Sequence, residues 1–170
     1  MNVRLFDAHN HLQDDRLKPF LEEILRQLPR NGVERMIVNG SCEEDWPQVL
    51  ELARRVPQIV PSFGYHPWYI KDRTAHWQEK LTGFLDQIPS AIGEIGLDKW
   101  IKDHDLPQQQ EVFTWQLRLA AERNLPVSIH CLQVWGRLLE ILKAEQLPKC
   151  GFVLHSFGGP GEMIKPLAEL

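Results

Sequence analysis

The chain has 170 residues, of which 43% are hydrophobic and 25% charged, and it carries a formal net charge of -4 at pH 7. This composition is ordinary for a soluble globular protein, and the length suffices for one domain with a sizeable core. The negative charge provides no overall basic field and excludes a tight, non-specific coat on DNA, so any contact with nucleic acid must come from a local patch or a bound metal.

Cysteine content and the N-terminal sequence indicate the compartment. The three cysteines, Cys42, Cys131 and Cys150, form an odd set without C-x-x-C spacing, which argues against a disulfide framework or a zinc knuckle. The N-terminus resembles no secretion signal, and no apolar run approaches the ~18 residues that span a bilayer. We therefore expect a cytoplasmic protein without a membrane segment.

Short strand-like runs alternate with longer runs of helical periodicity along the chain. The first strand-like run is "VRLFDA", and residues 16–32 follow it with apolar residues at helical spacing and Gly32 as a stop. Further strand-like runs cover residues 33–41, 58–67, 90–98, 125–131 and 150–159. The helical runs that follow them cover residues 43–57, 72–89, 106–124, 134–148 and 160–170.

This order predicts an α/β fold with a parallel sheet and outer helices. Six units in 170 residues average about 28 residues each, close to the roughly 31 of a (β/α)8 TIM barrel. A doubly wound open sheet shows the same alternation, but no G-x-G-x-x-G follows the first strand. Nearly every strand ends in a residue able to bind a metal or a ligand, as expected for a barrel with its site at the C-terminal ends of the strands. These residues are His9, His11, Asn39, His66, Glu94, His130 and His155.

The number of units is too small for a closed barrel of eight strands. We therefore expect one TIM-barrel-type domain over residues 1–170, with strands 7 and 8 missing. Either the polypeptide is a fragment, or another chain covers the open edge by self-association, because an exposed parallel edge invites aggregation.

Two histidines near the N-terminus and a buried acid are the first candidates for a metal site. His9 and His11 lie two residues apart on a predicted strand, so both can point to one face. H-x-H alone is weak evidence for a metal site, because two strand-end histidines satisfied by hydrogen bonds show the same pattern more often. Glu94 lies in the apolar strand "AIGEIGLD", where a carboxylate needs an ion pair, hydrogen bonds or a cation, and no Lys or Arg is nearer in sequence than Lys99.

The joint pattern favours a centre with two divalent ions. His130 and His155 each end an apolar strand, and in a barrel they would project to the same rim as His9, His11 and Glu94. Such nitrogen and oxygen ligands suit Zn, Mn, Mg or Ni, with Glu94 bridging two ions that activate a water.

Other residues beside these strands have weaker predictions. His66 lies in "GYHPW" and could contact a phosphate or stack a base together with its aromatic neighbours, or the loop could simply be rigid with exposed rings. Asp7 and Asp98 could orient ligand histidines. Cys131 should be a packing residue, as should four tryptophans of the helical runs, whereas two further histidines should be solvated. The tryptophans are Trp46, Trp77, Trp115 and Trp135, and the histidines are His76 and His104.

Five motifs in order resemble the TatD family of metal-dependent hydrolases, TIM barrels of the amidohydrolase superfamily. They are "DAHNHL" against D-x-H-x-H-L, "GYHPW" against G-x-H-P, "GEIGLD" almost unchanged, "LPVSIHC" against lPv-x-iH, and "LHSFGG" against H-x-F-x-G. The resemblance implies that Glu94 bridges two divalent ions, that His66 binds substrate phosphate, and that the protein is a deoxyribonuclease. The metal ligands it implies are His9, His11, Glu94, His130 and His155.

Two features depart from the family pattern. After the strand-five histidine the family often has an arginine and an aspartate, as in H-x-R-D-A, whereas here His130 is followed by Cys131, Leu132, Gln133 and Val134. The family's last ligand is an aspartate in an E-T-D motif at strand eight, and no aspartate follows Asp105 here.

Three hypotheses follow. The leading one is a phosphodiesterase, TatD-like, that uses a metal-activated water on nucleic acid or a small phosphodiester. The second is an amide, ester or lactone hydrolase of the same superfamily. The third is a truncated, non-catalytic metal-binding module.

Overall fold

The computed structural model of the chain describes residues 3–103 and 105–170, so the expectation for His104 lies outside the described residues. The described residues form six parallel strands in one sheet, ordered β1 to β6, so that each strand pairs with the next in sequence. The strands are β1 (Leu5–Asn10), β2 (Val33–Asn39), β3 (Ile59–Phe63), β4 (Ala91–Asp98), β5 (Val127–Leu132) and β6 (Phe152–Leu154).

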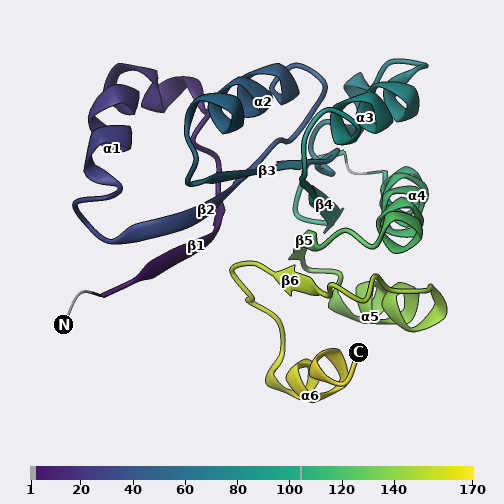
Figure 1. The fold of residues 1–170 in the computed structure, drawn as a ribbon. Coiled ribbons are helices and arrows are strands. Elements are labelled where there is room, and N and C mark those ends of the chain that lie inside the picture. Colours follow the sequence, from purple (N-terminus) through teal and green to yellow (C-terminus); the bar gives the residue numbers. More distant parts are fainter. Residues whose placement is uncertain (1–2, 104) are drawn as a thin grey trace.

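One helix follows each strand and lies outside the curved sheet (Figure 1). The helices are α1 (Leu21–Gln27), α2 (Trp46–Arg55), α3 (Trp77–Leu85), α4 (Leu106–Arg123), α5 (Trp135–Ala144) and α6 (Ile164–Ala168). The predicted α/β fold of TIM-barrel type with six βα units is confirmed. Among the described residues, no helix combines the length and apolar character that a membrane span requires.

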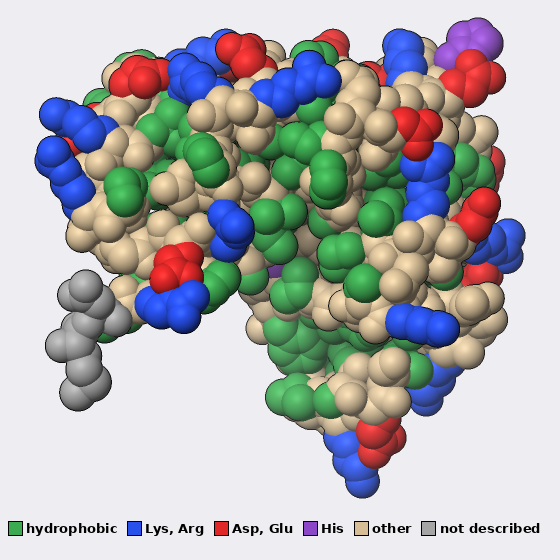
Figure 2. Space-filling view, viewed as in Figure 1, with side chains coloured by type: hydrophobic (Ala, Val, Ile, Leu, Met, Phe, Trp, Pro, Cys, Tyr) green, Lys and Arg blue, Asp and Glu red, His purple; other side chains and the backbone are tan. Residues whose placement is uncertain are grey.

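The sheet is curved but open, because within the described residues no pairing joins β6 to β1. Leu5 and Phe6 on β1 are 45% and 63% exposed, and Ile164 on α6 is 58% exposed. Figure 2, viewed as in Figure 1, shows the molecular surface hollowed between β1 and α6, with hydrophobic side chains along the hollow.

The helical prediction for residues 16–32 was too long. The described chain forms a 3-10 helix at Asp15–Phe20, which contains Pro19, and α1 ends at Gln27. Proline has no N–H for an α-helical hydrogen bond, so the α-helix begins only after it. Gly32 lies past the helix with φ at 74°, and a Cβ there would meet the Val3 carbonyl oxygen at 2.2 Å. This glycine therefore permits a close backbone approach before β2.

The core lies between the sheet and the helices. Trp46 is fully buried, Trp77 and Trp135 are each 7% exposed, and Trp115 packs against this core. Cys131 also belongs to the core, which confirms the sequence prediction that it is a packing residue. All eight residues of β4 are buried, and this strand runs through the middle of the sheet toward the site described below.

Gly93 on β4 occupies a position with no room for a side chain. A Cβ there would meet Ser128 Cβ at 2.8 Å, Ser62 Oγ at 2.8 Å and Asn39 Oδ1 at 2.9 Å. These atoms belong to three other strands, so the centre of the sheet's inner face is closed around a glycine.

We expect Gly93→Ala to destabilise the protein by about 1–3 kcal/mol, because the added methyl group overpacks this centre. Gly83→Ala is the matched control: Gly83 lies on α3 with nothing within 4 Å of a Cβ, and the change should stabilise by roughly 0.5–1 kcal/mol. Urea unfolding measures both. Equal stability of the two variants would contradict the described geometry.

Candidate metal centre

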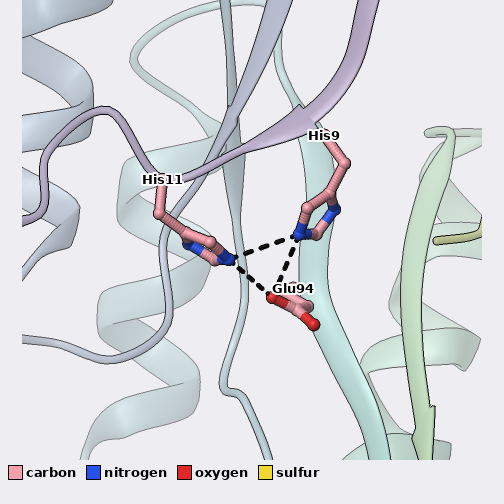
Figure 3. Close-up of side chains that lie close together, drawn as sticks. All are labelled: His9, His11 and Glu94. Carbon is pink, nitrogen blue, oxygen red and sulfur yellow. Dashed lines mark hydrogen bonds and ion pairs between the residues drawn. The ribbon is translucent and has the colours of Figure 1, made fainter. Parts of the chain in front are cut away.

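Glu94 on β4 is the centre of the site. Its side chain is 3% exposed, and its Oε2 atom lies 3.2 Å from His9 Nε2 and 2.9 Å from His11 Nε2. Figure 3 shows both histidines pointing from the end of β1 toward the Glu94 carboxylate. The two imidazole Nε2 atoms are 3.3 Å apart. Three ligand-type atoms therefore converge on one small volume.

The other carboxylate oxygen of Glu94 faces a second group of histidines. Oε1 lies 2.5 Å from His155 Nε2, 3.1 Å from His130 Nδ1 and 3.4 Å from His66 Nε2. All the ion-pair partners of Glu94 within the described residues are thus histidines, with no lysine or arginine among them. The structure brings together the six residues predicted for the site, which are His9, His11, His66, Glu94, His130 and His155.

Sheet geometry explains this convergence. His130 on β5 is in register with Gly96 on β4, and His155 directly follows β6. The His155 ring also stacks on His9 from β1, with ring centroids 3.8 Å apart and planes 2° from parallel. The C-terminal ends of the first and last strands therefore meet at the site even though the strands do not pair.

The Glu94 carboxylate is ionised. Burial on its own raises the pKa of Glu94, but hydrogen bonds from His11, His130 and His155 in their protonated forms hold that pKa well below its usual value. A buried carboxylate with this many imidazoles and no other cationic partner requires protonated imidazole or a bound cation for charge balance.

The neighbours of two rings determine which imidazole nitrogen carries the proton. His11 Nδ1 lies 2.8 Å from the Asn39 carbonyl oxygen, and His130 Nε2 lies 2.9 Å from Asp98 Oδ2. Both oxygens can only accept, so those nitrogens carry the hydrogen. In the neutral rings the lone pairs of His11 Nε2 and His130 Nδ1 then face Glu94, which is the arrangement a metal ligand requires.

His66 has the opposite arrangement. Its Nδ1 accepts the backbone N–H of Trp68 at 3.1 Å, so in the neutral ring Nε2 carries the hydrogen. His66 is 6% exposed, and burial lowers its pKa, which favours the neutral ring. His66 therefore offers an N–H donor to the site and no lone pair.

A polar layer beneath the site supports His9. Its Nδ1 lies 2.7 Å from Ser128 Oγ and 3.1 Å from the Asn39 side-chain nitrogen. Asn39 Oδ1 and Ser62 Oγ are buried, and neither has a hydrogen-bond partner among the described residues. Turning the Asn39 amide over would place its oxygen on His9 Nδ1–H and leave Nε2 with the lone pair toward Glu94.

These donors fit a divalent cation. Imidazole lone pairs and an ionised carboxylate suit Zn, Mn or Ni, and the buried acceptors behind His9, His11 and His130 fix the rings as metal sites generally require. Ligand-type atoms lie within 4.8 Å of one another in two groups, His9 with His11 and Glu94, and His66 with Glu94 and His130. Both groups contain Glu94.

Asp7 contacts a predicted ligand histidine through that residue's backbone, and another supporting residue was not predicted from the sequence. The Asp7 carboxylate accepts the backbone N–H of His9 and the Asn10 side-chain amide, so it fixes the chain and contacts no ring. Ser128 was missed, although a serine two residues before His130 in an apolar strand must share its face. The predicted contact of Asp98 with a histidine is present.

The site opens into a cavity of about 610 Å³. Its wall includes Arg16, Trp68 and Tyr69 besides the histidines, together with several acidic residues. Arg16 donates two hydrogen bonds to Asp14, so its charge is largely compensated.

The chain is similar to known proteins in both sequence and structure. The sequence profile of a family described as "TatD related DNase" matches residues 6–170. "Uncharacterized metal-dependent hydrolase YabD" of Bacillus subtilis is 32% identical over 169 residues, which are 98% of this chain and 66% of that protein. "3'-5' ssDNA/RNA exonuclease TatD" of Escherichia fergusonii is 31% identical over 93% of this chain and 61% of that protein.

A solved structure is also similar. The crystal structure of YjjV, described as a TatD homolog from Escherichia coli K12, superposes with a TM-score of 0.91 at 29% identity. The match covers 99% of this chain and 66% of that chain. The chain thus spans between 61% and 66% of the length of these relatives.

We expect His130→Gln to reduce the content of tightly bound metal, because it replaces the imidazole Nδ1 lone pair that faces Glu94. His66→Gln should retain the metal, because the His66 ring offers no lone pair to the site. Metal-stripped protein reloaded with Zn²⁺ or Mn²⁺, dialysed and measured by elemental analysis provides the readout. His76→Gln is the control, since this histidine is 72% exposed and pairs with Glu79. Equal metal loss in His66→Gln and His130→Gln would overturn the assigned proton positions.

Cysteine modification tests the burial beside His130. Burial raises the pKa of the Cys131 thiol to about 12, so at pH 8 it stays neutral. We expect iodoacetamide to alkylate the exposed Cys150 in the folded protein and to reach Cys131 only in urea. Mass spectrometry of peptides after timed labelling would contradict this if both thiols reacted at similar rates.

Proposed function

The chain belongs to the TatD family of metal-dependent hydrolases, and from that premise we propose that it hydrolyses phosphodiester bonds in nucleic acid. The single observation that carries the proposal is the Glu94 carboxylate, whose two oxygens face separate groups of histidines. A carboxylate so placed suits a pair of divalent ions, which is the usual arrangement for phosphodiester displacement.

We infer that His9 and His11 with Glu94 would hold one ion, and that His130 and His155 with Glu94 would hold the other. The ion would be Zn, Mn, Mg or Ni. When bound, such a pair acidifies water and stabilises negative charge on phosphate oxygens. Asp98 and the Asn39 carbonyl keep His130 and His11 in the orientation this requires.

His66 is the candidate for direct contact with the substrate. Its Nε2–H points at the same carboxylate oxygen as His130 and His155, and burial keeps the ring neutral. A neutral N–H donor can form a hydrogen bond to a phosphate oxygen whose negative charge grows during the reaction, and it keeps its proton throughout. Glu94 and His66 are therefore the two residues to which we assign catalytic roles.

Nucleic acid is the proposed substrate class. Relatives at about 30% identity are named single-stranded DNA and RNA exonucleases. We propose that residues 1–170 act as one TIM-barrel-type domain. We propose that self-association of two chains could cover the open edge of the sheet.

One observation favours a second function, an amide or carboxyl ester hydrolase with the same metals. The cavity wall has a single arginine, already bonded to Asp14, and it carries Asp15, Glu44 and Asp45. Such a wall favours a substrate with little negative charge.

A substrate panel decides between the two. Metal-reloaded protein is assayed with end-labelled single-stranded DNA, bis-p-nitrophenyl phosphate, p-nitrophenyl acetate and a simple lactone. We expect phosphodiester cleavage that chelation abolishes and that metal restores. His66→Ala should lower kcat by about 10²–10³ with its metal content unchanged, because it removes one donor to the transition state.

His76→Gln should leave these rates unchanged, since it lies outside the site. Metal-replete protein that is inert to both phosphodiesters but cleaves the ester or the lactone would establish the second function instead.

A further inference from the structure

We propose that Trp68 is a platform on which the substrate stacks the nucleobase beside the reacting phosphate, so that the site selects a nucleic-acid end with an unpaired base. This inference rests on the proposed function and adds the part of the substrate that lies outside the metal centre. It starts from a tryptophan that is exposed and yet held in place.

Trp68 is attached to the site at two points. Its backbone N–H donates to His66 Nδ1 at 3.1 Å, and its indole Nε1–H donates to Asp98 Oδ2 at 2.8 Å. Asp98 is fully buried, and the same oxygen lies 2.9 Å from His130 Nε2. One carboxylate oxygen thus fixes both the edge of the indole ring and a candidate metal ligand.

The ring itself remains available. Trp68 is 51% exposed and lines the 610 Å³ cavity. Its ring contacts His66 edge to face, with planes 87° apart and centroids 5.4 Å apart, and no stacked aromatic partner is present among the described residues. An aromatic ring with a satisfied N–H and an open face loses little further freedom on binding, which is the preorganisation that favours stacking.

The position suits one nucleotide. His66 Nε2–H points toward the metal centre, where the phosphate would lie, and Trp68 is two residues further along the same loop. Tyr69 lines the same cavity and is 38% exposed, which adds a second ring. A cavity wall with little free positive charge holds a nucleic acid better by stacking than by backbone contacts, because every base has a π-face.

Trp100 provides a matched control. It is 64% exposed and its backbone N–H donates to the other oxygen of Asp98 at 2.7 Å, but it does not line the cavity. Both tryptophans are therefore exposed rings near one carboxylate, and only Trp68 faces the site.

The kinetic experiment compares a short thymidine oligonucleotide with the same oligonucleotide carrying an abasic residue at the end that is cleaved. Wild-type protein and Trp100→Ala should prefer the base-containing substrate by roughly 5- to 150-fold in kcat/KM, mostly through KM. Trp68→Ala should lose most of this preference, whereas Trp68→Phe should keep a larger part of it. Unchanged preference in Trp68→Ala would overturn the inference.

A binding experiment separates this inference from the proposed function. In EDTA, where no phosphodiester is cleaved, the thymidine oligonucleotide should quench tryptophan fluorescence in wild-type protein and in Trp100→Ala, and the abasic oligonucleotide should quench it less. Trp68→Phe should lose this difference. Equal quenching of wild type and Trp68→Phe would overturn the inference whether or not the protein is a nuclease.

Thermal unfolding of each variant serves as the folding control. Loss of the base preference in Trp68→Ala with an unfolding temperature equal to that of Trp100→Ala supports a role in binding. If Trp68→Ala unfolds at a lower temperature, Trp68→Phe is the deciding variant: quenching equal to that of wild type in EDTA would show a purely structural role and would overturn the inference.

Discussion

The structure depends on one unfavourable burial, that of the Glu94 carboxylate in the middle of β4. An ionised acid removed from water costs several kcal/mol unless positive charge and hydrogen bonds accompany it. Here five imidazoles at the ends of four other segments surround the acid, two at one oxygen and three at the other, and the compensation comes from their added protons or from a cation held between them and the acid. The fold therefore places its strand ends where this acid needs them.

The supporting layer gives similar side chains different tasks. A carbonyl or a carboxylate behind His11 and His130 turns a lone pair toward the centre, whereas a backbone N–H on His66 Nδ1 turns a proton toward it. Five imidazoles of one chemical type thus divide into rings that can bind a cation and one that can bind an oxygen. The neighbours of each ring, more than the ring itself, determine its role.

Sequence reasoning reached the fold and the cluster because both follow from periodicity. The strands end at intervals of 22 to 35 residues, and parallel strands with outer helices bring these ends to one rim. It failed where the outcome depends on a single local contact. Pro19 delays the start of the α-helix within residues 16–32. The Asp7 carboxylate accepts the backbone N–H of His9 rather than a hydrogen of an imidazole ring. The positions of the protons on the imidazole rings could not be predicted either, because some depend on partners that are distant in sequence, as Ser128 is from His9.

The Asp98 carboxylate has a consequence beyond geometry. Its Oδ2 atom serves both His130 and the Trp68 indole, and its Oδ1 atom accepts the backbone N–H groups of Trp100 and Ile101, so the group has little freedom to turn. A ligand that strengthens the Asp98 contact with His130 therefore changes the free energy of the Asp98 contact with Trp68, and the reverse also holds. Thermodynamic linkage then requires reciprocity: if a cation on His130 strengthens whatever binds against Trp68, that binding strengthens the cation by the same factor.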